Sequence, residues 1–268
     1  MKFSIITATF NSDKTLIDNI LSVNNQSYKH IEHLFIDNES TDNTLEIIES
    51  ISNRRTKVVS QKDSGMYFAL NKGIDLADGD IIGILNSDDK FFDSDIIKNV
   101  CNTFIENDCD LVWGNVNILK KDSNKIHRIY NAKFNPIKGF EYGIMPPHPS
   151  IFIKKELYNK FGKFNTSFEI ASDYDLILRL IRIEKVRSKY INKCFAEMKT
   201  GGKSSISISS LIKLNIEISR INKNHFVDYS IWKFLIKILI RISERLNQTN
   251  IRNLFIEKFF KINKEQYA

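Results

Sequence analysis

Residues 31–42 read IEHLFIDNESTD, an apolar run that ends on an acidic residue and continues into a helix start. The run 31–36 has the composition of a β-strand. Thr41 and Asp42 carry side chains that accept hydrogen bonds from the free N–H groups of a first helical turn, and a helical pattern follows through Ser50. A strand that passes directly into a helix is the repeating unit of an α/β fold.

The same alternation extends in both directions from this stretch. The pattern predicts strands at 3–8, 31–36, 57–60 and 81–85, with helices at 13–24, 41–50 and 66–76 between them. Strands that alternate with helices of this length imply right-handed crossovers. We therefore expect an α/β, Rossmann-like layer with a mostly parallel sheet and flanking helices. In such a sheet the ligand lies at the carboxyl ends of the strands.

The rhythm changes beyond residue 89. At 268 residues the chain is long enough for one α/β core with additions. From residue 203 the pattern is helical to the end of the chain. Between these points we expect a helix at 94–106, a strand at 110–115, a hairpin over 116–130 with its turn at 122–124, a Gly- and Pro-rich loop at 139–149 and a helix at 174–183.

Charge is distributed unevenly along the chain. The formal net charge is +7, and residues 203–268 contain 12 Lys and Arg against 5 Asp and Glu, which accounts for the whole excess. Residues 1–202 contain 27 of each sign. An anionic partner is therefore expected at the last quarter of the chain and not at its main body. The cysteines Cys101, Cys109 and Cys194 show no metal-like spacing, and we interpret them as idle thiols in a reducing compartment.

Acidic residues end two of the predicted strands. Asp37 follows the run 34–36, and Asp88 and Asp89 follow 84–87. Carboxylates at these positions face the ligand crevice of an open sheet. Adjacent carboxylates can hold a divalent cation, and a cation that bridges two phosphates stabilises a leaving diphosphate. Each acidic residue taken alone also fits a turn or a helix N-cap, so the hypothesis depends on their combination.

Several motifs, in the same order, resemble one family. Residues 3–11 (FSIITATFN) are similar to the opening strand of inverting family 2 glycosyltransferases with the GT-A fold. Residues 34–42 (LFIDNESTD) resemble the next motif of that family, for which Asp-Gly-Ser-Thr-Asp is the common form. Residues 61–73 (QKDSGMYFALNKG) resemble a segment that usually reads Asp-x-Gly-x-Tyr-Asp-Ala-x-Asn-x-Gly, and 85–89 (LNSDD) occupies the place of the metal-binding Asp-x-Asp element.

The resemblance continues through 148–150 (HPS), 171–174 (ASDY) and 201–204 (GGKS), and so covers about residues 1–205. It implies a GT-A catalytic domain over these residues. The domain divides into a nucleotide-binding half at 1–90 and an acceptor half at 91–205, and residues 206–268 form a C-terminal amphipathic helical region.

The resemblance also implies a nucleotide site with a metal ion. Asp37 would accept a hydrogen bond from the uracil ring, Asp88 would lie near the ribose or the metal, and Asp89 would ligate Mn²⁺ or Mg²⁺. The residues expected to line the nucleotide pocket are Thr9, Asn11, Asp37, Asp63 and Asp88.

Asp173 occupies the place of the Asp in the family's Glu-Asp motif, whose role is general base. A sugar hydroxyl is a poor nucleophile, so a positioned carboxylate must take its proton as the new bond forms. His148, Gly201 and Gly202 would approach the diphosphate or the acceptor, although His148 alone also fits an ordinary loop histidine. In-line displacement between Asp173 and the metal would convert an α-linked donor into a β-linked product.

Three motifs depart from the family pattern, at four positions. Asn38 and Glu39 replace Asp-Gly, Phe68 stands where Asp is common, and Ser172 stands where Glu is common. None of these changes removes a residue that the chemistry requires. They leave the donor and acceptor preference open.

We therefore expect transfer of a hexose or N-acetylhexosamine from a UDP-sugar to an acceptor hydroxyl. The family analogy suggests a lipid-pyrophosphate-linked saccharide as acceptor and a bacterial surface polysaccharide, such as an O-antigen or a capsule, as product. Two other classes remain as alternatives. A non-catalytic UDP-sugar-binding protein would be expected to lack Asp88, Asp89 or Asp173, and a basic nucleic-acid-binding protein is disfavoured by the neutral first 202 residues. We expect no nucleic acid partner, and we leave a homo-oligomer open.

Residues 231–242 read IWKFLIKILIRI, in which Lys233, Lys237 and Arg241 recur every four residues. This spacing predicts a helix with one basic stripe and an otherwise apolar surface. Such a helix over 231–245 can lie on an anionic inner-membrane surface, or it can pack on the body or on another subunit with its lysines toward water. No run of about 18 uncharged apolar residues occurs. We therefore expect a cytoplasmic protein, peripheral at the inner face of the cell membrane.

Overall fold

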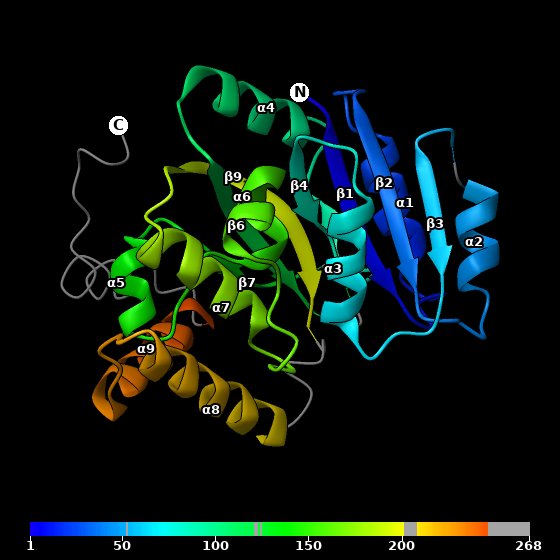
Figure 1. The fold of residues 1–268 in the computed structure, drawn as a ribbon. Helices are drawn as coiled ribbons and strands as arrows, with labels where there is room; N and C mark the ends of the chain where they lie inside the picture. Colours follow the sequence, from blue (N-terminus) through cyan, green and yellow to red (C-terminus); the bar gives the residue numbers. More distant parts are fainter. Residues whose placement is uncertain (52, 121–122, 124, 201–207, 246–268) are drawn as a thin grey trace.

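The computed structural model describes residues 1–51, 53–120, 123, 125–200 and 208–245 (Figure 1). Within these residues nine strands form one sheet in the order β3-β2-β1-β4-β8-β6-β9-β5, and β7 pairs with β6 beside this path. The strands are β1 (Phe3–Thr9), β2 (Ile31–Asp37), β3 (Thr56–Ser60), β4 (Ile81–Ile84), β5 (Lys90–Phe91), β6 (Leu111–Leu119), β7 (Ile126–Tyr130), β8 (Ile151–Lys154) and β9 (Ser188–Lys199).

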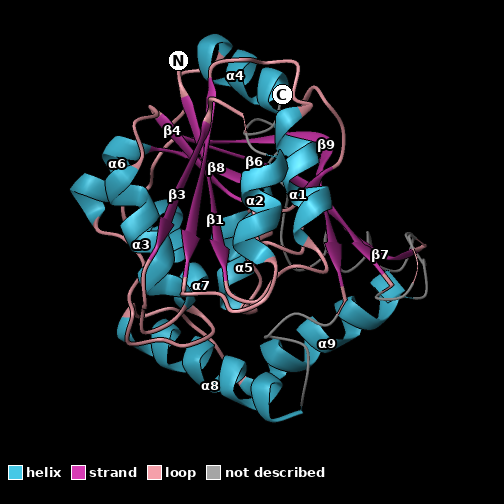
Figure 2. Ribbon diagram, turned by 90° about the vertical axis from the view of Figure 1, so that its right-hand side faces the viewer, coloured by secondary structure: helices cyan, strands magenta, loops and turns pink. Residues whose placement is uncertain are grey.

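Helices flank the sheet. Helices α8 and α9 lie together beyond the end of the sheet toward which the outer parallel strands β1, β2 and β3 point (Figures 1 and 2). A short 3-10 helix covers His148–Ser150, and α7 continues as a π-helical turn over Arg179–Ile183. The α-helices are α1 (Leu16–Asn24), α2 (Thr44–Ile51), α3 (Met66–Leu76), α4 (Ile96–Glu106), α5 (Pro136–Glu141), α6 (Lys155–Phe161), α7 (Ser172–Leu178), α8 (Ile208–Asn224) and α9 (Ile231–Arg245).

The first half of the chain forms the parallel part of the sheet, as expected. Strands β3, β2, β1 and β4 are all parallel neighbours. Successive side chains of β2 point to opposite faces, so Phe35 packs with Leu16 and Ile48 of α1 and α2, whereas Ile36 faces α3. Helix α3 approaches the sheet closely at Gly73, where a Cβ would lie 2.5 Å from Ile6 Cγ2.

The second half of the chain is mixed in strand direction. Strand β8 runs antiparallel to both β4 and β6, whereas β9 runs parallel to β6 and antiparallel to β5. The expected α/β class is therefore confirmed, but the sheet is mixed and not mostly parallel, with its parallel pairs concentrated on one side. The expected hairpin over 116–130 is present as β6 and β7, although residues 122 and 124 of its turn lie outside the described residues.

Several elements differ from the sequence expectation. Strands β5, β8 and β9 and helices α5 and α6 were not expected, and α5 extends into the predicted loop at 139–149. The side chain of Asn135 caps α5 by accepting hydrogen bonds from the N–H groups of Ile137 and Lys138, and Pro136 starts its first turn. This cap lies before the Gly and Pro residues that suggested a loop.

The helical pattern expected beyond residue 203 is confirmed for 208–224 and 231–245, which are α8 and α9, whereas 225–230 form a connection. Both helices share the hydrophobic core of the body, to which Ile218, Ile221 and Ile240 belong. The division of the chain at 205/206 stays a prediction, and it does not separate two cores. Within the described residues no helix is long and apolar enough to cross a membrane.

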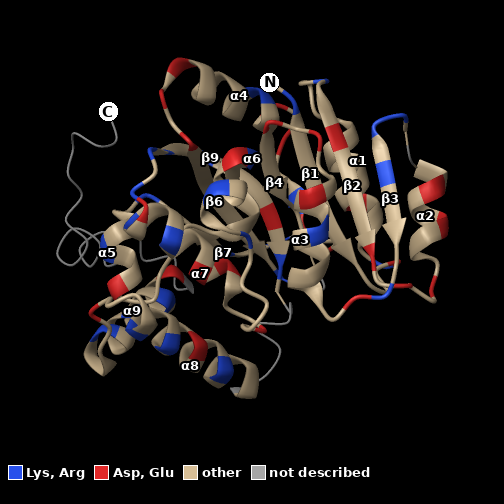
Figure 3. Cartoon of the chain, in the orientation of Figure 1, with Lys and Arg blue, Asp and Glu red and all other residues tan. Residues whose placement is uncertain are grey.

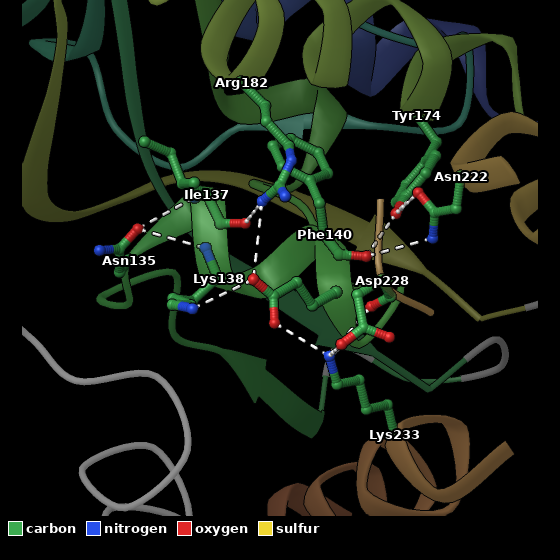
Figure 4. Close-up of polar contacts among 10 residues, drawn as sticks. Asn135, Ile137, Lys138, Phe140, Tyr174, Arg182, Asn222, Asp228 and Lys233 are labelled. Atoms are coloured by element: carbon green, nitrogen blue, oxygen red, sulfur yellow. Dashed lines mark hydrogen bonds and ion pairs between the residues drawn. The ribbon is translucent and has the colours of Figure 1, made fainter. Parts of the chain in front are cut away.

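The orientation of α9 corrects the expectation about its basic stripe. Lys233 Nζ lies 3.0 Å from the carboxylate of Glu141 on α5 and 2.6 Å from that of Asp228 (Figure 4). Lys237 points inward as well, with Nζ 3.4 Å from Asn215 Oδ1 on α8, and burial together with the charge of Arg241 lowers its pKa to about 7.

Arg241 completes the inward stripe, with its guanidinium 3.0 Å from Glu244 and 4.2 Å from the centre of the Tyr130 ring on β7. The expectation that this stripe faces water or lipid headgroups is therefore wrong, because acidic and aromatic partners from distant segments lie beneath the helix. Apolar side chains take the outside instead. Those exposed on α8, α9 and their connection are Leu211, Ile212, Ile216, Phe226, Ile231, Trp232, Leu235, Ile238, Leu239 and Ile242.

Candidate active site

The carboxyl ends of β1 and β2 meet at a buried carboxylate. Thr9 and Asp37 are paired in the strand register, and Thr9 Oγ1 donates to Asp37 Oδ1 at 2.9 Å. Ser40 donates from its backbone N–H to Asp37 Oδ2 at 2.9 Å and from Oγ to Oδ1 at 2.5 Å, and Ser60 Oγ at the end of β3 donates to Oδ2 at 2.8 Å.

Asp37 therefore lies at the predicted edge of the sheet, but its side chain is engaged by the protein. It is 0% exposed, and four hydrogen bonds fill the acceptor positions of its two oxygens. A direct hydrogen bond from a uracil ring would require one of these donors to leave. In this structure Asp37 holds together the strand ends on which the expected nucleotide pocket is built.

Two loops above this carboxylate carry further predicted residues. Asn11 adopts a left-handed conformation with φ of 50°, and its Oδ1 accepts from the N–H of Thr41 at 2.9 Å. The N–H of Asp63 donates to Asn38 Oδ1 at 2.7 Å, and Asp63 Oδ1 accepts from the N–H of Gly65 at 2.7 Å. Asn11 and Asp63 are thus each fixed to the segment that follows β2.

Asp88 and Asp89 follow β4 and join the same edge through Ser87, whose Oγ accepts from Ser12 Oγ at 3.0 Å. Asp89 is 2% exposed, and its Oδ2 accepts from Asn86 Nδ2 at 2.8 Å. Burial, and then the charge of Asp88, raise the pKa of Asp89 well above its usual range. Burial also raises the pKa of Asp88. Two carboxylates so placed favour the binding of a cation.

Asp173 lies in the first turn of α7. Its Oδ1 accepts from the N–H of Tyr174 at 2.8 Å and lies 3.5 Å from the hydroxyl of Tyr67 on α3. Burial raises the pKa of Asp173 to about 6, and the charge of Glu217 on α8 acts in the same direction. The hydroxyl of the adjacent Ser172 is buried and has no hydrogen-bond partner within the described part of the chain.

The three residues expected near the diphosphate or the acceptor have different outcomes. His148 belongs to the 3-10 helix and packs edge-on against Phe164, with ring centres 5.7 Å apart. Burial lowers the pKa of His148 to about 4, so at neutral pH its ring carries no charge with which to attract a phosphate. Gly201 and Gly202 lie outside the described residues.

The sequence profile of "Glycosyl transferase family 2" matches residues 4–181, which include the strand ends and Asp173. The chain belongs to glycosyl transferase family 2. Over 213 residues this glycosyltransferase is 26% identical to the "PGL/p-HBAD biosynthesis glycosyltransferase" of Mycobacterium tuberculosis, covering 77% of this chain and 80% of that protein. It is 29% identical over 228 residues to the chondroitin synthase of Escherichia coli, covering 83% of this chain but only 31% of that protein.

Solved structures are similar in fold. The S. aureus TarS fragment 1–349 in complex with UDP superimposes with a TM-score of 0.64 at 19% identity, covering 99% of this chain and 77% of that one. The mannosyltransferase PcManGT from Pyrobaculum calidifontis, in complex with GDP-Man and Mn²⁺, gives 0.59 at 15% identity, covering 95% and 85%. These likenesses confirm the GT-A fold of the glycosyltransferase.

Asp88 and Asp89 could provide two carboxylate ligands for a divalent cation, which is part of the ligand set that such an ion needs. Within the described ranges no three His, Cys, Asp or Glu side chains come together. Mg²⁺ in particular is usually held by one or two carboxylates and completes its ligands with water and substrate phosphates. The buried, adjacent carboxylates therefore fit a cation that arrives with a diphosphate.

Sequence reasoning missed several residues that the structure places around this site. Ser40 and Ser60 complete the contacts of Asp37, Tyr67 contacts Asp173, and Glu217 lies close enough to affect its pKa. Tyr67 stands inside the motif at 61–73, so its role was available from the resemblance. Glu217 has no motif of its own and is brought to Asp173 only by the packing of α8.

We predict that Asp37→Asn lowers the free energy of unfolding by about 1–3 kcal/mol, because an amide group would face donors where an oxygen now accepts. UDP affinity should fall about tenfold as the strand ends separate. Urea denaturation and calorimetric titration measure the two effects. The matched control is Glu39→Gln, which removes a charge from an exposed side chain in the same loop. Wild-type stability in Asp37→Asn would contradict the structural role of this carboxylate.

Proposed function

We propose that this glycosyltransferase moves a hexose or N-acetylhexosamine from a UDP-sugar to an acceptor hydroxyl, with inversion at the anomeric carbon and a β-linked product. Asp173 acts as the general base, and Asp89, with Asp88, would hold Mn²⁺ or Mg²⁺, which would supply positive charge to the departing diphosphate. Thr9, Asn11 and Asp63 line the pocket for the nucleoside.

One contact carries this proposal. Tyr67 belongs to α3, which begins directly after the Asp63–Gly65 turn of the expected nucleotide pocket. Its hydroxyl donates to the carbonyl of Ile170 at 2.6 Å and lies 3.5 Å from the carboxylate of Asp173. The base and the nucleotide side of the site are thereby joined, which supports a sugar held between them.

The environment of Asp173 suits proton transfer. A general base works best when its pKa lies near the working pH, and burial raises that of Asp173 to about 6. At neutral pH its carboxylate is ionised and accepts the proton of the acceptor hydroxyl as that oxygen bonds to the anomeric carbon. The bond from the anomeric carbon to UDP breaks in the same step. A bound divalent cation would supply positive charge to the departing diphosphate.

The relatives support the choice of donor and pathway. Solved structures of similar fold hold UDP, UDP-GlcNAc or GDP-Man. The curated relatives include proteins named for PGL/p-HBAD biosynthesis and for chondroitin synthesis. We propose a UDP-sugar donor, a lipid-pyrophosphate-linked saccharide acceptor and a role in bacterial surface polysaccharide biosynthesis.

We further propose that α8 and α9 rest on the inner membrane surface, through their apolar side chains and not through the basic stripe. Trp232 is 73% exposed and Phe226 94% exposed, and the apolar face of α8 continues the same surface. An apolar groove of about 570 Å³ runs between the helices, lined by Ile212, Ile216 and Phe234 among others. Both helices lie on the side toward which the outer parallel strands point, so a lipid-linked acceptor would be close to the site (Figure 2).

The proposed function predicts metal-dependent UDP release in the presence of a short-chain lipid-pyrophosphate-N-acetylhexosamine acceptor. One member of a panel of UDP-sugars should support acceptor-dependent release with Mn²⁺. EDTA and Asp89→Ala should each abolish it, because the departing diphosphate would lose its counter-charge. GDP-mannose serves as the control donor. Acceptor-dependent release of GDP from GDP-mannose, with no release of UDP from any UDP-sugar, would overturn the UDP assignment.

We predict that Asp173→Asn binds UDP with unchanged affinity but loses about 10²–10⁴-fold in kcat, because an amide accepts no proton. In the wild type kcat should fall about tenfold per pH unit below about pH 6, since protonation of Asp173 removes the base. Exposed Asp78→Asn is the matched control. Normal turnover by Asp173→Asn, or a flat profile down to pH 5, would show that another group is the base.

Replacing Trp232, Leu235 and Leu239 together by Ser should abolish sedimentation with liposomes, because the inserted apolar area is lost. Leu76→Ser, at an exposed leucine on α3, is the control and should sediment like the wild type. The alternative is that a second copy of the chain covers this surface. Light scattering of the wild type without lipid tests for such a dimer. A dimer that the triple variant disrupts, together with unchanged liposome binding, would assign the surface to a second copy of the chain.

A further inference from the structure

Three consecutive backbone N–H groups converge on one carboxylate of α8. Glu217 Oε1 accepts from the N–H of Glu169 at 3.1 Å, and Oε2 accepts from those of Ile170 and Ala171 at 3.0 and 2.8 Å. Hydrogen bonds from backbone N–H groups to an ionised carboxylate are among the stronger ones in proteins. Figure 3 shows basic and acidic positions on α8, and in the sequence its acidic residue is Glu217.

The segment held in this way leads directly to the proposed base. Residues 169–171 end where α7 begins, and Asp173 is the second residue of that helix. The same segment is held from the opposite side by Tyr67 of α3, whose hydroxyl donates to the carbonyl of Ile170. The N–H and C=O groups of Ile170 are thus fixed by side chains from two different helices.

Further contacts tie α8 to α7 itself. The hydroxyl of Tyr174, next to Asp173, lies 2.9 Å from both Asn222 Oδ1 and the carbonyl of Phe140 (Figure 4). Asn222 Nδ2 donates to the same carbonyl at 3.2 Å. Near the end of α8, His225 Nε2 lies 3.2 Å from Asp175 Oδ1. Helix α8 and the residue that follows it therefore contact the chain both before and after Asp173. These contacts fix the orientation of the first turn of α7.

We propose that Glu217 is a positioning residue for the general base: its carboxylate holds the segment 169–171 and so fixes the place of Asp173 at the sugar. This inference rests on the proposed function, because that function gives Asp173 its role as the base. The hydrogen bonds of Glu217 to residues 169–171 do not depend on the proposed function. It assigns a part in the active site to a helix beyond the match to the family profile, which ends at residue 181.

Glu217 also contributes an electrostatic effect. Among the described side chains, the hydroxyl of Tyr67 from α3 and the carboxylate of Glu217 from α8 affect the ionisation of Asp173, and the Lys213–Glu169 ion pair lies on the surface. The negative charge of Glu217 disfavours ionisation of Asp173 and adds to the effect of burial on its pKa. Removing that charge while keeping the side-chain shape should lower the pKa of Asp173.

The experiment compares Glu217→Gln and Glu217→Ala in the full-length chain, with exposed Glu184→Gln as the charge-matched control. An amide oxygen keeps the two hydrogen bonds from Ile170 and Ala171, but its NH₂ group faces the N–H of Glu169. We therefore expect a loss of about threefold in kcat for Glu217→Gln. For Glu217→Ala, which frees the whole segment, we expect a loss of about 10²-fold. UDP affinity and donor KM should stay within about twofold of wild type in both variants.

Carboxyl-carbon NMR titration of Asp173 gives a readout that does not depend on turnover. The pKa of Asp173 should be lower in Glu217→Gln than in wild type and unchanged in Glu184→Gln. An unchanged pKa together with wild-type kcat in Glu217→Ala would overturn the inference. A lowered pKa with undiminished turnover in both Glu217 variants and in Asp173→Asn would confirm the contact and instead reject Asp173 as the base.

Discussion

The buried carboxylate of Asp37 ties together the ends of the outer parallel strands β1, β2 and β3. A carboxylate with no exposed surface is tolerated only when its oxygens are fully paired, and here Thr9, Ser40 and Ser60 provide the four hydrogen bonds. The loops that follow the strands are built on this arrangement. The proposed nucleotide pocket lies at this edge and would therefore depend on a residue that need not touch the nucleotide.

The proposed base is organised differently from the nucleotide edge. Asp173 does not extend from a strand, and its place results from contacts with α3 and α8, which are far apart in the chain. Such an arrangement couples the two sides of the site, because Tyr67 follows the nucleotide loop and Glu217 belongs to the helices of the apolar surface. Movement of α8 would therefore be transmitted to the first turn of α7.

Helix α9 shows how packing can reverse the polarity suggested by a helical pattern. Long basic side chains can reach acidic or aromatic partners beneath a helix, and Lys233 and Arg241 do so. Six apolar residues of α9 are then left outside, where a lipid surface or another chain would cover them. For the described residues 208–245, net charge is therefore a poor guide to the chemistry of the surface.

The sequence by itself determined the parallel half of the fold, the family and the acidic residues at the strand ends, because local apolar runs, helix starts and ordered motifs carry that information. It also indicated Asp173 through a motif. Tertiary structure alone decided strands β5, β8 and β9 of the mixed half, since the four-residue strand β8, for example, is specified by its pairing with β4 and β6 and not by its own pattern. Tertiary structure alone also placed Glu217 against the segment 169–171 that leads to Asp173, and it turned the basic stripe of α9 inward. Hydrogen bonds and ion pairs between distant segments have no periodicity in the sequence, so they become visible only when the chain is folded.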